Sequence, residues 1–589
     1  MSLVHAPERA AGHRDDLKTP TTESTLWFGP TDRPLFGWVH RPADGRAIGA
    51  VVLCPPLARE WTNAHYAYRL LAEHLAAAGM LAVRFDYDGT GDSAGEDGDP
   101  ARVAAWLASI SAAVELARGS GCPSVSLVGM RMGALLAAVA TAGTGSIDGV
   151  VLWDPCSSPR AFLREQSALH RLALDDHPVA EGIVELPGMV LDAPTAAELS
   201  SLEIPEVRHP PARVLLLTRP GRQPQVDLAG ALGAEITEGP ALGQERLLDV
   251  DLAEREIPME TMGHIVSWLA TPNPGPVGPV VVPRRESARI GVAGTSVTEQ
   301  TVRIGPAGLF GIVTDPDDPR VSTTVLMLNS GNNSHVGPSR LWVDLARRWA
   351  SMGVRCVRFD ESGLGDSPTR PGQAPQVIRA PENFDDVEDA RRALCADPAD
   401  VAVVGLCSGG YQALEAALAR PLRAVCAINP ILHFTPPELA HGPMDPRRRI
   451  CWPVGSFVGA YRLLAVEPVR RQLSKAVWRV AHLLHRRRNP AEWLDRLRAE
   501  AVDVLILCGV NEARSFGVEA YDTLATSDGD RVQIEVIEGL DHALVPAWQR
   551  ADVASRMTEH LEKVLFLADP PAANDAGAPV HGPSEAVGR

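Results

Sequence analysis

A cysteine stands between closely spaced glycines in the segment Gly405-Leu406-Cys407-Ser408-Gly409. The segment follows the apolar run Val401–Val404 and precedes a helical pattern. A sharp turn between strand and helix holds its central side chain at a strained backbone conformation, exposed for reaction. We therefore predict that Cys407 is a nucleophile and that the amide of Ser408 donates to a developing oxyanion. The alternative is a glycine-rich turn around a buried structural cysteine.

Two further apolar runs lead to residues that would complete a catalytic set. Val504–Leu507 leads to Glu512, and Gln533–Ile537 leads to His542 in the loop that follows. The chain order of nucleophile, acid and histidine is one in which such triads occur. Glu512 and His542 each fit a solvated surface position equally well alone, so the prediction depends on the three residues together. Asn511 is a weaker alternative for orienting the histidine.

The run Thr324–Leu328 ends in a loop that begins Asn329-Ser330-Gly331-Asn332-Asn333. A loop at this strand end supplies the second backbone donor of an oxyanion hole, and both Gly331 and Asn332 qualify. Each such donor contributes about 3 kcal/mol of transition-state stabilisation. Asp360 and the turn that follows it are interpreted as scaffolding, because Asp and Gly lock tight turns.

The elements that position these residues alternate between strands and helices. Continuous Val, Leu and Ile runs, such as 324–328 and 401–404, are separated by amphipathic stretches such as 341–353. Unbroken apolar strands joined by helices indicate a mostly parallel sheet that is covered on both faces. The sequence therefore predicts a doubly wound α/β fold.

The chain repeats this pattern once, at a spacing of about 275 residues. Val83-Arg84-Phe85-Asp86 returns as Val357-Arg358-Phe359-Asp360, and Val128–Gly133 returns as Val404–Gly409. A period of this length indicates a duplicated domain. We predict a disordered arm over 1–24, a first domain over 25–270, a Pro-rich linker over 271–299, a second domain over 300–567 with a helical cap at about 431–500, and a disordered tail over 568–589.

On these motifs, both halves resemble the serine-aminopeptidase-like α/β-hydrolases, including esterase-like members encoded beside exosortase or peptide and polyketide assembly genes. The resemblance covers nearly the whole chain outside the linker and tails. It implies two tandem α/β-hydrolase domains, with the acid three residues after Gly509, at Glu512. Most relatives carry serine in the elbow, whereas Cys407 resembles the dienelactone hydrolases and some cysteine thioesterases. This departure points away from ordinary peptidase or esterase activity.

The first copy lacks these catalytic groups. Aligned on the repeat, the positions of nucleophile, acid and base hold Arg131, Arg222 and Leu242. Arginine supplies neither a nucleophile nor a carboxylate, and leucine carries no proton. We therefore predict a degenerate, non-catalytic first domain. Its two arginines either bind an anion at the old pocket or pair with local acids, and pairing is the plainer interpretation.

A cysteine nucleophile favours thioester substrates, because one thioester replaces another when the acyl-enzyme forms. The acyl-enzyme then stays reactive towards amines, alcohols and water. The predicted function is acyl transfer through a covalent acyl-enzyme on a thioester or ester, as an acyltransferase or thioesterase in natural-product biosynthesis. The alternatives are hydrolysis of esters or lactones and, in a different class, a non-catalytic binding or scaffold protein.

The predicted cap carries a surplus of positive charge. Residues 431–500 contain thirteen Lys and Arg against six Asp and Glu, interleaved with tryptophan, phenylalanine and tyrosine. One hypothesis is that the cap receives an acyl chain and docks an acidic acyl-carrier protein or a phosphopantetheine phosphate. The alternatives are a solvated basic face on an amphipathic lid and contact with anionic lipid.

The composition narrows the class of protein. The net charge of −17 argues against nucleic acid as a partner. The nine cysteines show no C-x-x-C spacing, so neither a disulfide framework nor a zinc cluster is predicted, and no cofactor is called for. No apolar run reaches the roughly 18 residues of a membrane span, and the N-terminus lacks the apolar core of a signal peptide. We therefore expect no transmembrane segment and a cytoplasmic location.

Overall fold

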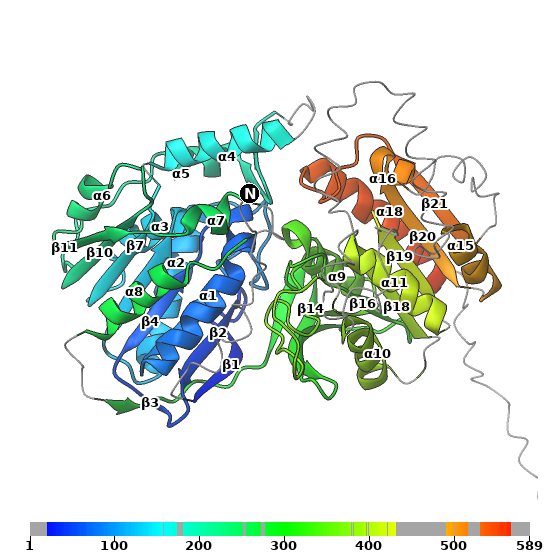
Figure 1. Ribbon diagram of the computed structural model, residues 1–589, viewed down its shortest axis with the longest axis horizontal. Helices are drawn as coiled ribbons and strands as arrows, with labels where there is room; N and C mark the ends of the chain where they lie inside the picture. Colours follow the sequence, from blue (N-terminus) through cyan, green and yellow to red (C-terminus); the bar gives the residue numbers. More distant parts are fainter. Residues whose placement is uncertain are drawn as a thin grey trace, which may run out of the picture.

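The computed structural model describes residues 20–566 apart from 157, 174–180, 251–254, 272–276, 379, 381, 396, 398–399, 421, 431–489, 501 and 516–530. The chain forms two successive α/β units, each built around one large twisted sheet (Figure 1). Most of the predicted cap, the predicted tail and residues 1–19 of the predicted arm lie outside the described residues.

The first sheet has eight strands in the order β1-β2-β5-β4-β6-β7-β10-β11. The pairs β1–β2 and β2–β5 are antiparallel, and the other neighbours are parallel. In sheet order the strands are β1 (Thr21–Phe28), β2 (Leu35–Pro42), β5 (Leu81–Phe85), β4 (Ala50–Cys54), β6 (Val125–Met130), β7 (Gly149–Trp153), β10 (Arg213–Thr218) and β11 (Glu235–Pro240). Two short antiparallel pairs join β8 (Ile183–Leu186) to β9 (Met189–Asp192) and β3 (Arg46–Ala47) to β12 (Gly278–Pro279).

Helices cover both faces of this sheet because the central strands are apolar on both sides. Helices α1, α7 and α8 contribute to the apolar core on one face, and α2, α3, α4 and α5 contribute to the core on the other. The helices are α1 (Arg59–Ala77), α2 (Arg102–Gly119), α3 (Met132–Ala140), α4 (Pro159–Ala173), α5 (Ala193–Ser200), α6 (Val226–Gly230), α7 (Gln244–Leu248) and α8 (Met259–Ala270).

The second sheet repeats the order of the first with one strand added, as β13-β14-β15-β17-β16-β18-β19-β20-β21. Strand β14 takes the place of β1, and β21 takes the place of β11. In sheet order the strands are β13 (Ser287–Val292), β14 (Thr295–Ile304), β15 (Leu309–Pro316), β17 (Arg355–Phe359), β16 (Thr324–Met327), β18 (Val401–Leu406), β19 (Ala424–Ile428), β20 (Asp503–Gly509) and β21 (Val532–Ile537).

The helices of the second unit follow the same division. Helices α9 and α18 pack on one face, and α10, α11 and α15 pack on the other. The helices are η1 (Pro338–Arg340), α9 (Leu341–Ser351), α10 (Glu382–Leu394), α11 (Ser408–Ala419), α15 (Pro490–Ala499), α16 (Val510–Ser515) and α18 (Ala547–Phe566). Among the described helices, none is long and apolar enough to cross a bilayer.

The predicted doubly wound α/β class is confirmed, but two predicted segment boundaries need correction. Strand β1 begins at Thr21, inside the predicted arm. The predicted linker contains β13 and the start of β14, which form an antiparallel hairpin. Buried and exposed residues alternate along β13, which is the pattern of a half-buried strand. The prolines between 272 and 283 favour an extended spacer, and the predicted linker continued this spacer over the strand that follows.

A small apolar core lies between the two units. Trp27, Phe36 and Trp38 of the first unit pack against Phe310 and other residues of the second. The rings of Trp38 and Phe310 have centroids 4.6 Å apart. The two halves therefore bury apolar surface against each other in addition to being joined by the chain.

Candidate active site

Cys407 lies at the turn between β18 and α11, with backbone angles φ 57° and ψ −111°. A positive φ is costly for a non-glycine residue and persists only where the surroundings enforce it. The flanking glycines make the turn tight enough: a Cβ on Gly405 would lie 2.1 Å from the carbonyl carbon of Gly409. A Cβ on Gly409 would lie 2.5 Å from the carbonyl oxygen of Asn329. The predicted elbow is therefore present in the backbone.

Replacement of Gly405 by alanine is expected to destabilise the second unit by about 1–3 kcal/mol and to lower the reactivity of Cys407, because backbone must move to admit the new methyl group. Denaturant unfolding and alkylation of Cys407 by iodoacetamide measure the two effects. Gly263→Ala is the control, since no heavy atom lies within 4 Å of the added Cβ and the site is helical. We expect it to be neutral or stabilising by up to about 1 kcal/mol. Equal unfolding midpoints for the two variants would contradict the tight packing of the elbow.

The predicted acid and base meet beside the elbow. Nδ1 of His542 lies 3.2 Å from Oε1 of Glu512. Burial lowers the pKa of His542, but hydrogen bonds to Cys407 and Glu512 and the charges of both groups raise it to about 10. Burial raises the pKa of Glu512, but the bond to His542 brings it below its ordinary value. A protonated imidazole therefore stands between a sulfur atom and a carboxylate, which favours a thiolate.

Asn429 holds the base against the strand of the acid, and sequence reasoning missed this residue. Its side-chain amide donates to the carbonyl oxygens of Asp541 and His542 at 3.1 and 3.2 Å, and its Oδ1 accepts from the amide of Gly509 at 2.9 Å. Asn429 has a φ of 41°. Its only sequence signal is its place directly after β19, where the first unit has Asp154 with a φ of 45°.

The predicted oxyanion loop lies against the elbow. The amide of Gly331 donates to Oγ of Ser408 at 2.8 Å. The amide of Ser408 opens α11 and so has no acceptor within the helix. Asn332 is 8% exposed. Gly331 and Asn332 both remain candidates for the second donor.

Two other predictions concern residues that are not described. The side chain of Asn511, the alternative orienter, is not described. The basic and aromatic cap residues between 431 and 489 also lie outside the described residues, so the structure does not bear on the docking hypothesis.

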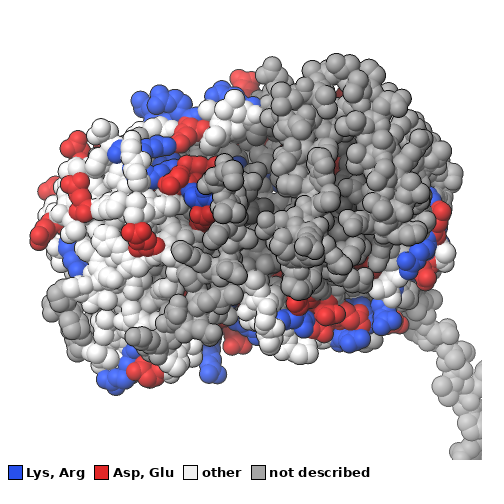
Figure 2. Space-filling model, in the orientation of Figure 1, with Lys and Arg blue, Asp and Glu red and all other residues white. Residues whose placement is uncertain are grey.

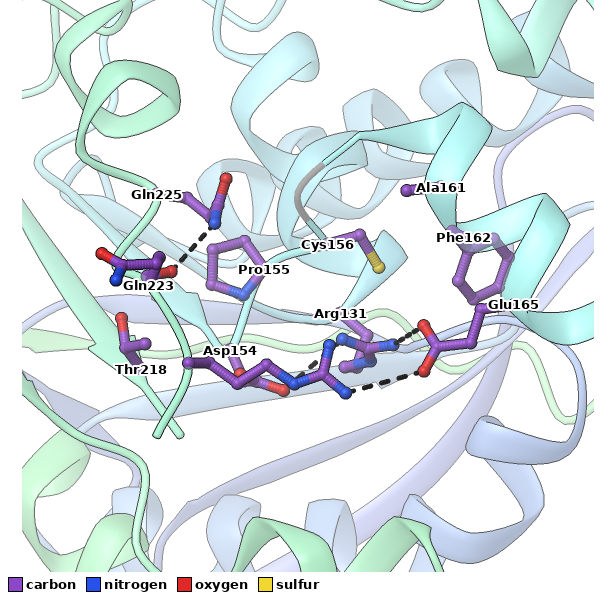
Figure 3. Close-up of a pocket in the computed structure, with 11 residues that line it drawn as sticks. Arg131, Asp154, Pro155, Cys156, Ala161, Phe162, Glu165, Thr218, Gln223 and Gln225 are labelled. Atoms are coloured by element: carbon purple, nitrogen blue, oxygen red, sulfur yellow. Dashed lines mark hydrogen bonds and ion pairs between the residues drawn. The ribbon is translucent and has the colours of Figure 1, made fainter. Parts of the chain in front are cut away.

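Arg131 occupies the nucleophile position of the first unit in the same backbone conformation, with φ 54° and ψ −118°. Its guanidinium lies 3.1 Å from Glu60, 3.0 Å from Glu165 and 3.5 Å from Asp154. Arg222 approaches the other oxygen of Glu165 at 3.7 Å. Figure 3 shows Arg131, Asp154 and Glu165 gathered at a cavity of about 220 Å³. The two arginines thus lie close together, and carboxylates balance their charge.

Strand register corrects one of the sequence correspondences. Leu507 of β20 pairs with Glu535, and its counterpart Leu217 pairs with Gly239. This register does not support Leu242 as the counterpart of His542. The prediction of Leu242 came from matching a Glu-Gly pair in each copy, but that pair falls at different places along the two strands. The sequence between β11 and α8, residues 241–258, contains no histidine.

Comparison with known families supports the division into two units. A model of the α/β hydrolase family matches residues 325–556, and a model of serine aminopeptidase S33 matches residues 49–177. The expected resemblance to serine aminopeptidases is therefore found in the first half, and the second half matches the broader family. No curated protein matches the chain.

Solved structures resemble one half of the chain at a time. An esterase from Pyrococcus furiosus is 15% identical, with 46% of this chain and 91% of that chain covered and a TM-score of 0.30. Dienelactone hydrolase from Anabaena variabilis is 14% identical over 48% and 100%, with a TM-score of 0.29. Proline iminopeptidase from Mycobacterium smegmatis is 18% identical over 46% and 100%, with a TM-score of 0.28.

Proposed function

We propose that this chain, which carries two α/β-hydrolase domains in tandem, transfers acyl groups through a covalent intermediate on Cys407. The observation that carries the proposal is the strained elbow of Cys407 beside a His542 that also contacts Glu512. The substrate class that fits a thiol nucleophile best is a thioester or an activated ester. The first domain takes no direct part in the chemistry, because Arg131 stands where the nucleophile would be.

Acylation uses the charges already in the site. The thiolate of Cys407 attacks the carbonyl carbon, and the carbonyl oxygen takes the negative charge towards the amide of Ser408 and that of Gly331 or Asn332. When the tetrahedral intermediate collapses, the carbon–sulfur bond of the leaving thiol breaks, and the imidazolium of His542 gives the leaving thiolate its proton. An acyl thioester remains on Cys407.

Acylation also prepares His542 for the second step. Part of the rise in the pKa of His542 comes from the sulfur of Cys407. A thioester carries no negative charge, so that part is lost and the imidazole becomes a base. It then takes the proton of an incoming alcohol, amine or water as that group attacks the acyl carbon. Collapse of the second intermediate releases the product and restores the thiolate and the imidazolium.

Intact-protein mass spectrometry after incubation with acyl thioesters tests the proposal. We expect a mass increase equal to one acyl group, located on Cys407. Product analysis with amine and alcohol acceptors then separates acyl transfer from hydrolysis of an ester, thioester or lactone. If no ester or thioester gives an adduct or turns over, a non-catalytic binding or scaffold role is favoured instead.

The raised pKa of His542 predicts how the rate of acylation of Cys407 depends on pH. Because this pKa is about 10, His542 keeps its proton through the neutral range and loses it as pH rises through about 10. With an alkyl ester, whose alkoxide must gain a proton to leave, we expect the acylation rate to fall as pH rises through about 10. Alkylation of Cys407 by iodoacetamide needs no such proton and serves as the control. An acylation rate that keeps rising above pH 10 would contradict the role of His542 as proton donor.

Delivery of the acyl group by a carrier protein is a separate part of the proposal. It depends on the surplus of positive charge in residues 431–500, which favours an acidic partner. Binding of an acyl-carrier protein should weaken as salt rises, since exposed charges are screened. Absent or salt-insensitive binding would remove the carrier protein and leave free thioesters as the substrate class.

A further inference from the structure

Buried charges cross from one half of the chain to the other. Arg84 of β5 donates to Asp366 at 2.8 Å, and Arg358 of β17 pairs with Asp92. All four side chains are at most 3% exposed. Arg84 and Asp92 occupy the same places in the first repeat as Arg358 and Asp366 in the second. The two ion pairs are therefore equivalent: in each, the arginine of one half binds the aspartate of the other.

Each aspartate also contacts a histidine, but the two histidines come from different places in the two repeats. Nε2 of His65 lies 3.2 Å from Oδ2 of Asp366, and Nε2 of His335 lies 2.8 Å from Oδ2 of Asp92. His65 belongs to α1. His335 belongs instead to the loop between β16 and α9, which is the loop that contacts the elbow. The first half thus reaches the active-site loop of the second.

Hydrogen bonds continue from His335 to the elbow. The amide and Nδ1 of His335 contact the carboxylate of Asp360 at 2.6 and 2.8 Å. Asp360 also accepts from Nδ2 of Asn329 at 2.8 Å. Two residues further on, the amide of Gly331 donates to Oγ of Ser408 at 2.8 Å. Together these bonds fix both ends of the loop segment 329–335.

We propose that Asp92 is a positioning residue for the chemistry at Cys407, acting through His335 on the loop 329–335. The inference rests on the proposed function, because it takes the amides of this loop as oxyanion donors. It assigns the degenerate half a specific task, which is to supply a fixed carboxylate to the active site of its neighbour.

We call the connection from Asp92 through His335 to the loop 329–335 the brace. A positive charge on His335 strengthens its hydrogen bonds. Burial lowers the pKa of His335, but Asp360 and Asp92 raise it well above its ordinary value. Bonds between an imidazolium and carboxylates are roughly twice as strong as neutral ones. The ligand atoms of His335, Asp360 and Asp366 lie within 4.8 Å of one another, as in a cation site. Both ring nitrogens of His335 already lie 2.8 Å from carboxylate oxygens, Nδ1 from Asp360 and Nε2 from Asp92, which is the geometry of an ion pair.

Asp92→Asn tests the inference because the variant keeps much of the interface. Arg358 retains Glu299 at 2.8 Å, and the main-chain carbonyl of residue 92 still accepts from Arg347 at 2.6 Å. His65→Asn is the matched control. It removes the equivalent contact between His65 and Asp366, and Asp366 keeps its ion pair with Arg84.

We expect Asp92→Asn to lower kcat by about tenfold with KM nearly unchanged, because the donors are displaced by a fraction of an ångström. Hydrogen exchange should become faster at the amides of 329–335. His65→Asn should change neither quantity. Equal loss of kcat in both variants, or unchanged exchange in Asp92→Asn, would overturn the brace. Exchange needs no turnover, so it decides this point even if the wild-type protein proves to have no acyl-transfer activity.

Discussion

Replacement of Cys407 by alanine is expected to lower acyl turnover by at least about a thousandfold and to remove the covalent adduct. The members of a nucleophile–base–acid set act as a unit, so loss of the nucleophile removes most of what the set contributes. The elbow backbone should survive, since alanine is smaller than cysteine and keeps a Cβ. Steady-state release of thiol and intact-protein mass spectrometry measure the two effects.

Two matched variants make this result specific. Cys395 is a partly exposed free cysteine directly after α10, and Cys395→Ala should keep both turnover and adduct. Cys407→Ser keeps the shape of the elbow but replaces a thiolate by a hydroxyl that stays protonated beside His542. It should retain reduced activity if His542 can serve as a base. An adduct that persists in Cys407→Ala would place the nucleophile at another residue.

The fold was predictable because its signals are local. Apolar runs broken by amphipathic stretches indicate a parallel sheet wherever they occur, and the repeat showed the pattern twice. The candidate triad was predictable for the same reason, because Cys407, Glu512 and His542 each follow an apolar run. Parallel strands bring their carboxyl ends to one edge, and there the acid and base do meet.

The contacts that hold the site together were not predictable from local pattern. In the sequence, Asn429 is an ordinary residue after a strand. Its contacts with the loop of His542 appear only in the folded structure, where this loop and β20 lie beside it. In the sequence, Arg84 and Arg358 stand out only as equivalent positions of a repeated motif. Their partners lie more than 250 residues away in sequence, and no periodicity reports a pairing of that kind.

The buried ion pairs between the halves differ from the exposed charges on the surface. The visible face in Figure 2 shows acidic and basic side chains interspersed over the described part of the first half. Exposed ion pairs of this kind contribute about 0–1 kcal/mol each. The ion pairs between the halves are expected to contribute more, because they are buried. When a buried carboxylate loses its arginine, water cannot take the place of the arginine.

Arg358→Met is therefore expected to lower the free energy of unfolding by about 3–5 kcal/mol. The Arg358 side chain is fully buried and pairs with Asp92 and Glu299. Burial raises the pKa of both carboxyl groups, but their charged partners bring it below the ordinary value, so both are ionised at neutral pH. Methionine fills a similar volume and leaves these charges with fewer partners. Denaturant unfolding followed by far-ultraviolet circular dichroism measures the change.

Arg289→Met provides the contrast for this prediction. Arg289 pairs with Asp317 on the surface, where the two side chains are 67% and 43% exposed. The same chemical change there should alter the free energy of unfolding by less than about 1 kcal/mol, because water replaces the lost partner. If the two variants unfold at the same denaturant concentration, the charges between the halves contribute no more than surface pairs. The positioning role of Asp92 would then lack the support of strong buried ion pairs between the halves.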